Sequence, residues 1–283
     1  MQAEQTIGRY LIERLHALGV RHVFGVPGDY VLGFYAELTA GPLQMINTCD
    51  EQGAGFAAGA YARLRGLGAL CITYCVGGLK VANAVAQAYA ERSPLVVVSG
   101  APGMSERVKN PLLHHKVRDF DTQLKVFQEF TVAAALLGDP ATAFQEVDRV
   151  LAAVQRYRRP VYLELPRDMV QARGSAVPPF VAPAAHSDPD VLREALDRVV
   201  DRLRGARQPV ILAGAELHRF GLQDQLVALL DKTRLPVPRR CSASRSCART
   251  TRASSASTRA RWGTRTCAPT WSPATACCCS ACR

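Results

Sequence analysis

The run Leu95-Val96-Val97-Val98-Ser99 constrains the fold more than any other stretch of this sequence. It is apolar without alternation, rich in β-branched residues and too short for a core helix, which is typical of a strand buried on both faces. Such strands occur in parallel sheets that carry helices on both sides. The sequence therefore predicts an α/β domain built around this strand.

Strand and helix patterns alternate through the first 170 residues, which favours a parallel sheet flanked by helices. Thr6 is expected to cap a helix whose apolar residues follow helical spacing and which ends at Gly19. Further strands are expected at residues 23–26, 43–48, 69–74 and 160–165. Further helices are expected from Glu51 to about Leu64 and at residues 79–91 and 144–156.

The pattern changes after residue 171, where the first domain (1–171) is expected to end. Residues 172–189 contain four prolines and no apolar periodicity, which indicates a linker. Residues 190–238 then resemble the start of a second α/β domain that is cut short. This unit is predicted to hold a helix at 191–203, a strand at 210–213, a helix at 222–231 and the start of a strand at Leu235.

The last stretch, residues 239–283, has an abnormal composition. It holds nine arginines, no acidic residue and seven of the ten cysteines, and it contains no Leu, Ile, Val, Phe, Met or Tyr. Without large aliphatic residues it is expected to build no core. We favour a shift of the reading frame in a GC-rich gene, or disorder. A zinc knuckle at Cys279 and Cys282, or phosphate binding by the arginines, stays open as the alternative.

Composition limits the class of protein. The net charge is +11, but nine of these charges belong to residues 239–283, so the first 238 residues give little reason to expect a nucleic-acid partner. No apolar run reaches the roughly 18 residues of a membrane helix, and the N-terminus lacks a secretory signal. The body has three scattered cysteines, which suits a reducing compartment. We expect a cytoplasmic protein.

Three short stretches could carry chemistry, although each also has a structural explanation. Asp50 and Glu51 stand where a strand meets a helix, where carboxylates also act as caps. His114 and His115 follow a buried strand and offer proton donors near neutral pH, although a surface histidine is usually structural. Asp29 follows another strand in a turn, where aspartate is common.

Three glycines after Glu51 imitate the spacing of a dinucleotide-binding loop. They are Gly53, Gly55 and Gly59. Because they fall inside the expected helix and not in the turn before it, they are predicted to permit close helix packing instead.

Several segments in order resemble the pyruvate/indolepyruvate decarboxylase family of thiamine-diphosphate enzymes. The resemblance covers residues 1 to about 238, and the histidine pair separates the decarboxylases from the acetolactate-synthase branch. The segments are Phe24-Gly25-Val26-Pro27-Gly28-Asp29-Tyr30, the stretch from Asp50 to Arg63, Thr73-Tyr74-Cys75-Val76-Gly77-Gly78, Tyr89-Ala90-Glu91-Arg92-Ser93-Pro94, Ser99-Gly100-Ala101-Pro102, Leu113-His114-His115 and the stretch from Arg159 to Pro166.

The resemblance implies a thiamine-diphosphate-binding fold and a role for each matching residue. Glu51 matches the glutamate that hydrogen-bonds the aminopyrimidine ring of thiamine diphosphate and promotes deprotonation of the thiazolium carbon. Asp29 matches an acid beside the substrate that relays protons after CO2 leaves, and His114 and His115 match the pair that positions this acid and supplies a proton. Thr73 and Val76 lie in the stretch that borders the pyrimidine, so they are expected to contact the cofactor.

The resemblance also implies a small 2-oxo acid as substrate, an aldehyde and CO2 as products, and a homo-oligomer. The family binds Mg2+ and the diphosphate in a C-terminal domain that this sequence lacks, so no metal ligand is expected here and the chain alone is expected to be inactive. Gly78 departs from the family, which usually has alanine at this position. A pyrimidine-binding subunit of a two-chain decarboxylase and a catalytically silent truncated product remain as alternatives.

Overall fold

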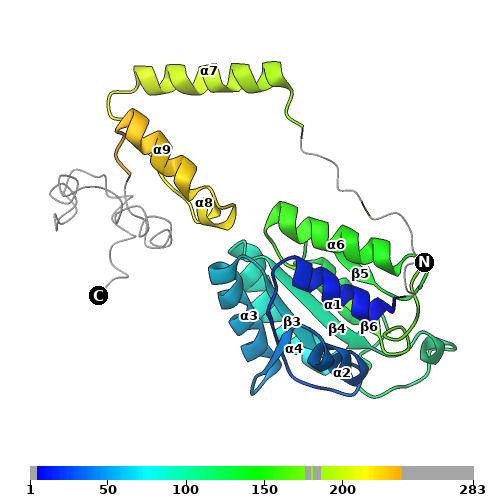
Figure 1. Ribbon diagram of the computed structural model, residues 1–283. Helices are drawn as coiled ribbons and strands as arrows, with labels where there is room; N and C mark the ends of the chain where they lie inside the picture. The colour runs from blue at the N-terminus through cyan, green and yellow to red at the C-terminus, as the bar shows by residue number, and fades with distance from the viewer. Residues whose placement is uncertain (1–4, 176–179, 181–185, 238–283) are drawn as a thin grey trace. The chain divides into compact units, whose positions relative to one another are not determined.

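The computed structural model describes residues 5–175, 180 and 186–237 of the chain (Figure 1). The chain divides into two compact units, with the boundary after Asp201. The first unit contains the domain in which all the candidate residues lie.

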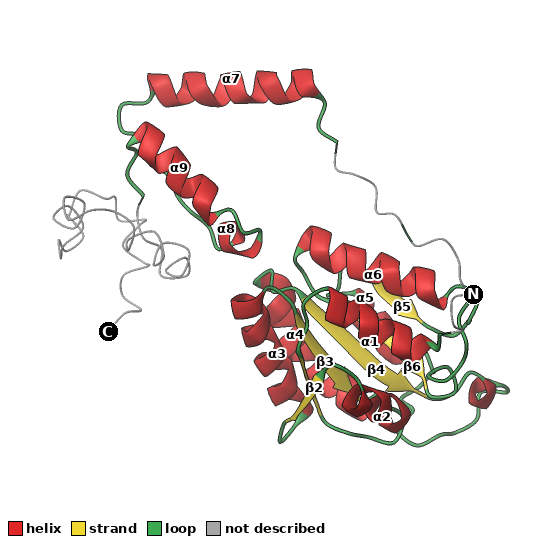
Figure 2. Cartoon of the chain, in the orientation of Figure 1, coloured by secondary structure: helices red, strands yellow, loops and turns green. Residues whose placement is uncertain are grey.

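The first domain is organised around one six-stranded sheet in which every strand pair is parallel (Figure 2). The strand order is β2-β1-β3-β4-β6-β5. Strand Leu95–Ala101 (β4) lies in the middle of the sheet and pairs with Gly68–Ile72 (β3) and Val161–Pro166 (β6). The other strands are His22–Gly25 (β1), Gln44–Asn47 (β2) and Ala134–Leu136 (β5).

Helices cover both faces of this sheet. Ile7–Ala17 (α1), Leu32–Ala40 (α2) and Ala143–Tyr157 (α6) pack into one buried cluster with the sheet. Glu51–Arg65 (α3), Val76–Ala90 (α4) and Thr122–Gln128 (α5) pack on the opposite face. One 3-10 turn, Ser105–Arg107 (η1), follows β4.

The middle strand shows why the sheet needs helices on both sides. Val96 and Val98 belong to the α1–α2–α6 cluster, whereas Leu95 and Val97 belong to the opposite cluster. All seven residues of β4 are buried. The predicted parallel sheet flanked by helices is therefore confirmed.

Local signals set the ends of the helices. The Thr6 side chain accepts a hydrogen bond from Arg9 N–H at the start of α1, and the Asp50 side chain accepts one from Gly53 N–H at the start of α3. Gly66 ends α3 with φ of 94°, a left-handed conformation that favours glycine.

Only one of the three glycines in α3 supports the predicted close packing. A Cβ at Gly55 would come within 2.5 Å of Val81 and 2.7 Å of Ala84 in α4, so this position requires glycine. A Cβ at Gly59 would meet nothing within 4 Å, and one at Gly53 would meet only the Asp50 cap. The packing explanation is therefore wrong for Gly59 and Gly53.

Four elements of the first domain are not predicted from the sequence: α2, η1, α5 and β5. Strand β5 has only three residues and lies at the edge of the sheet, so it is too short to show a period. Helix α5 spans only two turns of the helix and follows a long loop.

The first domain extends into the predicted linker. Ala172 C=O accepts a hydrogen bond from Ile7 N–H at 3.0 Å, and Gly174 N–H donates to Gln5 C=O at 3.2 Å. Residues 172–175 thus fasten the end of the domain to its beginning. Residues 176–179 and 181–185 of the linker, and residues 238–283 of the predicted aberrant tail, lie outside the described residues.

After the linker, the two predicted helices fall close to their expected positions, a third short helix lies between them, and the two predicted strands do not form. The helices are Pro189–Gly205 (α7), Glu216–Arg219 (α8) and Gln223–Thr233 (α9). Residues 210–213 and 235–237 are not strands, and one backbone bond, from Ile211 N–H to Pro236 C=O, joins them. Within residues 186–237, the buried cluster that could support strands holds only Ala213, Leu226 and Val237, so the prediction of strands is wrong here.

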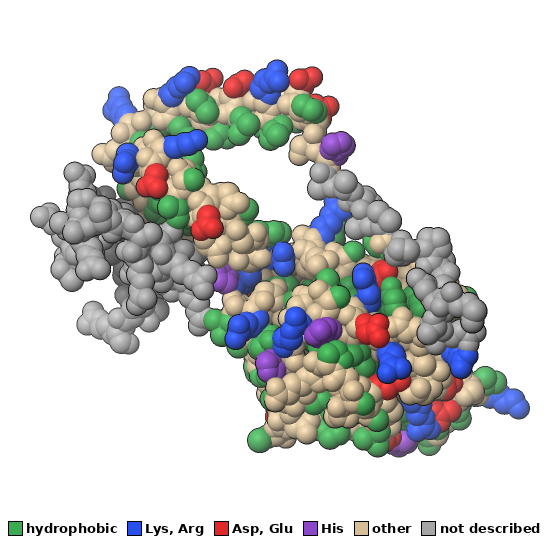
Figure 3. Space-filling model, viewed as in Figure 1, with side chains coloured by type: hydrophobic (Ala, Val, Ile, Leu, Met, Phe, Trp, Pro, Cys, Tyr) green, Lys and Arg blue, Asp and Glu red, His purple; other side chains and the backbone are tan. Residues whose placement is uncertain are grey.

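Helix α7 has one apolar side and one charged side (Figure 3). Three of its apolar residues, Val191, Leu196 and Val199, are more than half exposed. None of the described helices combines the length and the hydropathy that a membrane span requires.

Candidate active site at the carboxyl edge of the sheet

The six candidate residues all follow the carboxyl ends of strands. Asp29 follows β1, Glu51 begins α3 after β2, Thr73 and Val76 follow β3, and the two histidines lie in the loop after β4. Because the strands are parallel, these ends lie at one edge of the sheet, where α/β proteins gather ligand-binding loops.

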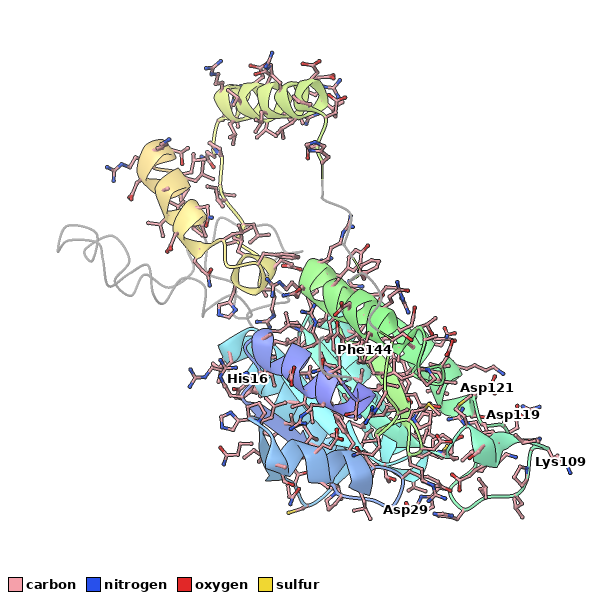
Figure 4. All side chains as sticks on the ribbon, turned by 45° about the vertical axis from the view of Figure 1, so that its right-hand side comes forward. His16, Asp29, Lys109, Asp119, Asp121 and Phe144 are labelled. Atoms are coloured by element: carbon pink, nitrogen blue, oxygen red, sulfur yellow. The ribbon has the colours of Figure 1, made fainter. Side chains whose placement is uncertain are left out.

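Asp29, His114 and His115 form one cluster. His114 Nε2 and an Asp29 carboxylate oxygen are in hydrogen-bond contact, and His115 Nδ1 lies 3.9 Å from the other oxygen. The two imidazole rings are 4.8 Å apart between centroids. Figure 4 labels Asp29 and shows it on the same side of the domain as Lys109 and Asp119, which belong to the histidine-bearing loop. Residues that are 85 positions apart in the chain are thus brought together.

The electrostatics of the cluster favour an ionised Asp29. Partial burial raises the pKa of Asp29, but the hydrogen bond from His114 and the charges of both imidazoles outweigh burial, so the pKa lies below its usual value. Since the Asp29 side chain is 38% exposed, it remains open to a ligand or to water. The cluster can therefore exchange protons between a carboxylate and two imidazoles.

Tyr30 supports His114. Its hydroxyl donates to the backbone carbonyl of His114 at 3.1 Å and lies 3.2 Å from His114 Nδ1. The two rings are stacked at 4.8 Å, and the Arg167 guanidinium lies 5.2 Å from the centre of the Tyr30 ring. Burial is the main reason that the pKa of Tyr30 is raised, so the hydroxyl keeps its proton and acts as a donor. These contacts fix the His114 ring against Asp29.

Thr73 joins the cluster to the turn after β3. Its hydroxyl donates to Asp29 at 3.5 Å. A Cβ at Gly28 would come within 2.4 Å of Thr73 Cβ, so the two turns can approach this closely only with glycine at position 28.

Glu51 lies at the same edge but outside the Asp29 cluster. Its carboxylate is 15% exposed and lies 3.5 Å from Lys80 Nζ. A Cβ at Gly77 would lie 3.3 Å from Glu51 Oε1 and 3.1 Å from Thr73 Cγ2, so the missing side chain leaves both groups side by side along the start of α4. Among the described contacts, none joins Glu51 directly to either histidine.

The histidine-bearing loop is held in an unusual backbone conformation. His115 has φ of 64°, and Lys109, Asn110 and Arg118 also have positive φ values. Such conformations in non-glycine residues persist where the surroundings hold them and cluster at functional sites. His115 Nδ1 is buried, and no group in the described part of the chain forms a hydrogen bond with it. Its nearest charged neighbour among the described residues is the Asp29 carboxylate, 3.9 Å away.

The residues after β2 and β3 fit the aminopyrimidine end of thiamine diphosphate. A carboxylate, Glu51, faces a start of α4 that is cleared of side chains at Gly77, and the apolar Val76 beside it is 51% exposed. A flat heterocycle with ring nitrogens needs this combination of a polar partner and an apolar surface.

The described residues do not fit Mg2+ in the same way. The one group of three potential metal ligands among them is Asp29 with the two histidines, whereas Mg2+ prefers oxygen ligands in octahedral geometry.

Comparison with known proteins decides between the possible families. Residues 5–125 match the family model described as thiamine pyrophosphate enzyme, N-terminal TPP binding domain. The chain is 42% identical over 229 residues to indole-3-pyruvate decarboxylase from Azospirillum brasilense, a match that covers 80% of this chain and 42% of that protein. These matches support the thiamine-diphosphate-dependent 2-oxo acid decarboxylase family for this chain. The predicted resemblance is thereby confirmed.

Two further relatives agree with this assignment. An alpha-keto-acid decarboxylase from Mycobacterium leprae (strain TN) is 38% identical, with 83% of this chain and 42% of that protein covered. Pyruvate decarboxylase 3 from Arabidopsis thaliana is 35% identical, with 82% of this chain and 40% of that protein covered. The chain spans about two fifths of the length of these relatives.

Sequence reasoning missed residues that support the site. Tyr30 follows Asp29 in the segment from Phe24 to Tyr30, but nothing in its spacing indicates that it stacks on His114, 84 positions later. Lys80 and Gln123 could be found only after α4 and α5 were placed, because both act through residues distant in the chain.

Proposed function

We propose that this chain supplies the pyrimidine-binding and proton-relay half of a thiamine-diphosphate-dependent decarboxylase, which converts a small 2-oxo acid to an aldehyde and CO2 without oxidation. The observation that carries the proposal is the Asp29–His114–His115 cluster at the same sheet edge as Glu51. The names of the relatives support a 2-oxo acid as the substrate class.

Each candidate residue then has a defined task. Glu51 hydrogen-bonds the aminopyrimidine ring, and Val76 and Thr73 border this ring. Asp29 accepts a proton at its ionised carboxylate and passes it on, and His114 and His115 orient that carboxylate and exchange protons with it. When bound, thiamine diphosphate would supply the electron sink for breaking the bond to CO2.

We assign the diphosphate and Mg2+ to the part of the family protein that this chain does not span. Most of the affinity for the cofactor should come from charge-assisted contacts to the diphosphate and its metal. We therefore expect the 283-residue chain alone to bind thiamine diphosphate weakly and to be inactive. A homo-oligomer and a cytoplasmic location belong to the same proposal.

A pyrimidine-binding subunit of a two-chain enzyme fits the chain less well. Such a subunit should end near residue 170, whereas this chain continues into α7, α8 and α9. A silent truncated product is the alternative against which the experiment below is designed.

The test compares two proteins in an assay for aldehyde release from pyruvate, phenylpyruvate and indolepyruvate with thiamine diphosphate and Mg2+. The first is the 283-residue chain, for which we expect no turnover. The second is residues 1–238 fused to the remaining part of the Azospirillum brasilense relative. We expect turnover by the fusion, its abolition by Glu51→Gln, and a loss of about 10²–10⁴-fold with Asp29→Asn.

Asp50→Asn is the matched control, because Asn also caps helices and the exchange removes a charge next to Glu51 without touching the pyrimidine. It should leave most of the activity. Turnover by the fusion that survives Glu51→Gln would contradict the role of Glu51. Robust turnover by the 283-residue chain itself would show that the missing part is not required.

A further inference from the structure

Gln123 is a completely buried amide on α5 that contacts three different elements. Its Oε1 accepts a hydrogen bond from Cys75 N–H, just before α4, at 2.6 Å. Its Nε2 donates to Ser99 Oγ in β4 at 2.7 Å and to Tyr162 Oη in β6 at 2.6 Å. Both ends of the amide are therefore satisfied, and its orientation is fixed.

Gly78 provides the space for this amide. A Cβ at position 78 would lie 1.9 Å from Gln123 Oε1 and 2.3 Å from Gln123 Cδ. An alanine at this position could not coexist with Gln123 in its observed place. The departure at Gly78 and the buried amide at Gln123 are thus two parts of one arrangement.

The Gln123 amide supports the strained backbone conformation of Cys75. Its φ of 49° and ψ of −72° lie in a sparsely populated region of backbone conformation, close to that of a γ-turn. Its buried N–H group donates to the Gln123 side chain and not to a backbone carbonyl. Strained residues of this kind persist only where their surroundings hold them.

The turn at Cys75 carries the residues proposed to border the pyrimidine. Thr73, two residues earlier, donates to Asp29, and Val76 follows as the first residue of α4. Tyr74 Oη donates at 2.8 Å to the Phe120 carbonyl in the loop that bears the histidines. A shift at Cys75 would therefore move both sides of the site.

The Gln123 amide is also one end of a series of polar contacts that reaches the start of the histidine-bearing loop. Tyr162 Oη, which accepts from Gln123, donates to Glu164 at 2.7 Å, and Glu164 pairs with Arg107 at 3.1 Å. Arg107 belongs to η1, before the histidines, and Gln123 belongs to α5, after them. This series of polar contacts therefore fastens both ends of the histidine-bearing loop to strand β6.

We propose that Gln123 is a positioning residue that holds the strained turn at Cys75, so that Thr73 and Val76 stand at fixed places beside the pyrimidine. That the ligand is a pyrimidine ring rests on the proposed function. The positioning itself rests only on the contacts of the described residues.

The test uses the 283-residue chain and the variant Gln123→Met, which keeps the length of the side chain and removes all three hydrogen bonds. Methyl NMR signals of Thr73 and Val76 report the place of the turn, and hydrogen exchange reports the Cys75 amide. We expect Gln123→Met to shift and broaden both methyl signals and to speed exchange at Cys75 about 5- to 10-fold relative to buried amides of β4. Ser99→Ala is the matched control, because it removes a buried partner of the same amide but leaves the bond to Cys75.

Two further comparisons separate positioning from general loosening. Gly78→Ala should reproduce the methyl shifts, because the added methyl displaces the Gln123 amide. Combining Gly78→Ala with Gln123→Ala should remove the steric conflict. The double variant should therefore lose less free energy of unfolding than the sum of the two single variants. Thiamine serves as the probe for the pyrimidine end and should perturb the Val76 methyls of the wild-type chain.

The outcomes distinguish the two proposals. Methyl signals that change no more in Gln123→Met than in Ser99→Ala would overturn the positioning role. A wild-type chain that shows no response to thiamine at millimolar concentration, with the turn displaced in Gln123→Met, would count against the proposed ligand and leave the positioning role standing.

Discussion

Replacing Arg107 by Met should destabilise the first domain strongly at neutral pH and much less in mild acid. The Arg107 side chain is only 12% exposed and its partner Glu164 is fully buried. Arg107 Nη2 donates to Glu164 at 3.1 Å, and Nε donates to the Pro102 carbonyl at 3.1 Å. Without Arg107, the hydroxyl of Tyr162 is the one side-chain partner that the Glu164 carboxylate keeps among the residues that the structure describes.

The size of the loss depends on whether Glu164 stays ionised without a partner or takes up a proton. Leaving one member of a buried ion pair uncompensated costs about 3–5 kcal/mol. Glu164 can avoid part of this cost by taking up a proton. For a carboxyl with an ordinary pKa of about 4.3, protonation costs about 3.7 kcal/mol at pH 7 and about 1.6 kcal/mol at pH 5.5. The loss in Arg107→Met should therefore be about 3–4 kcal/mol at pH 7 and about half of that at pH 5.5.

The direction with pH follows from the pKa of Glu164. Burial raises this pKa above 4.5 in the wild-type protein, against the opposing hydrogen bond from Tyr162 and the charge of Arg107. An acid with a raised pKa in the folded state contributes most stability below its unfolded pKa, and stability falls as the pH rises toward the folded pKa. Removal of Arg107 raises the folded pKa further, so the window of falling stability extends to higher pH.

Hydrogen exchange of peptides from β4 and β6, corrected for intrinsic rates at pH 5.5 and pH 7, measures this free energy of unfolding directly. Arg107→Met combined with Glu164→Gln should lose the pH dependence. Arg149→Met, which removes a partly exposed pair with Glu146, should cost less than about 1 kcal/mol at both pH values. A loss below about 1 kcal/mol in Arg107→Met at pH 7, or a loss independent of pH, would refute the reasoning.

Two further predictions concern the site. Gly28→Ala should cost about 1–3 kcal/mol in chemical denaturation because its Cβ would lie 2.4 Å from Thr73 Cβ, whereas Gly33→Ala in α2, where a Cβ meets nothing, should be neutral or slightly stabilising; equal losses would contradict this explanation. His114→Gln should raise the pKa of Asp29, because burial then acts against fewer favourable contacts, and a carboxyl-detected NMR titration that shows no rise would contradict the assigned cause. Since the pKa of Asp29 is lowered in the wild-type protein, the stability that it contributes is present above its unfolded pKa and is lost as the pH falls through its folded pKa.

The first domain could be predicted in large part because its strongest signals are local. The β-branched run in β4 needs burial on both faces whatever surrounds it, and Thr6 and Asp50 cap helices through bonds within three residues. Strand β5 and helix α5 could not be predicted in this way, because their place depends on pairing with β6 and on packing beside α4, which the chain forms only after folding.

The candidate site was likewise only partly predictable from local signals in the sequence. The six candidate positions follow from the strand ends, so their common edge could be expected from a parallel sheet. The arrangement around them could not. The pairing of Gly78 with Gln123 joins residues 45 positions apart through a side-chain amide, and nothing in the spacing of the two residues predicts it.

The order of the strands has a consequence for where any ligand can enter. From β1 the chain moves outward to β2 and then returns across β1 to reach β3, so the connections on either side of β1 leave in opposite directions. Helix α2 consequently covers one face and α3 the other, and the chain does not bridge the gap between the carboxyl ends of β1 and β3. Such a switch in winding direction opens a crevice in doubly wound sheets. Asp29 and Thr73 meet at this switch point, so the winding of the backbone locates the candidate site before any catalytic side chain is considered.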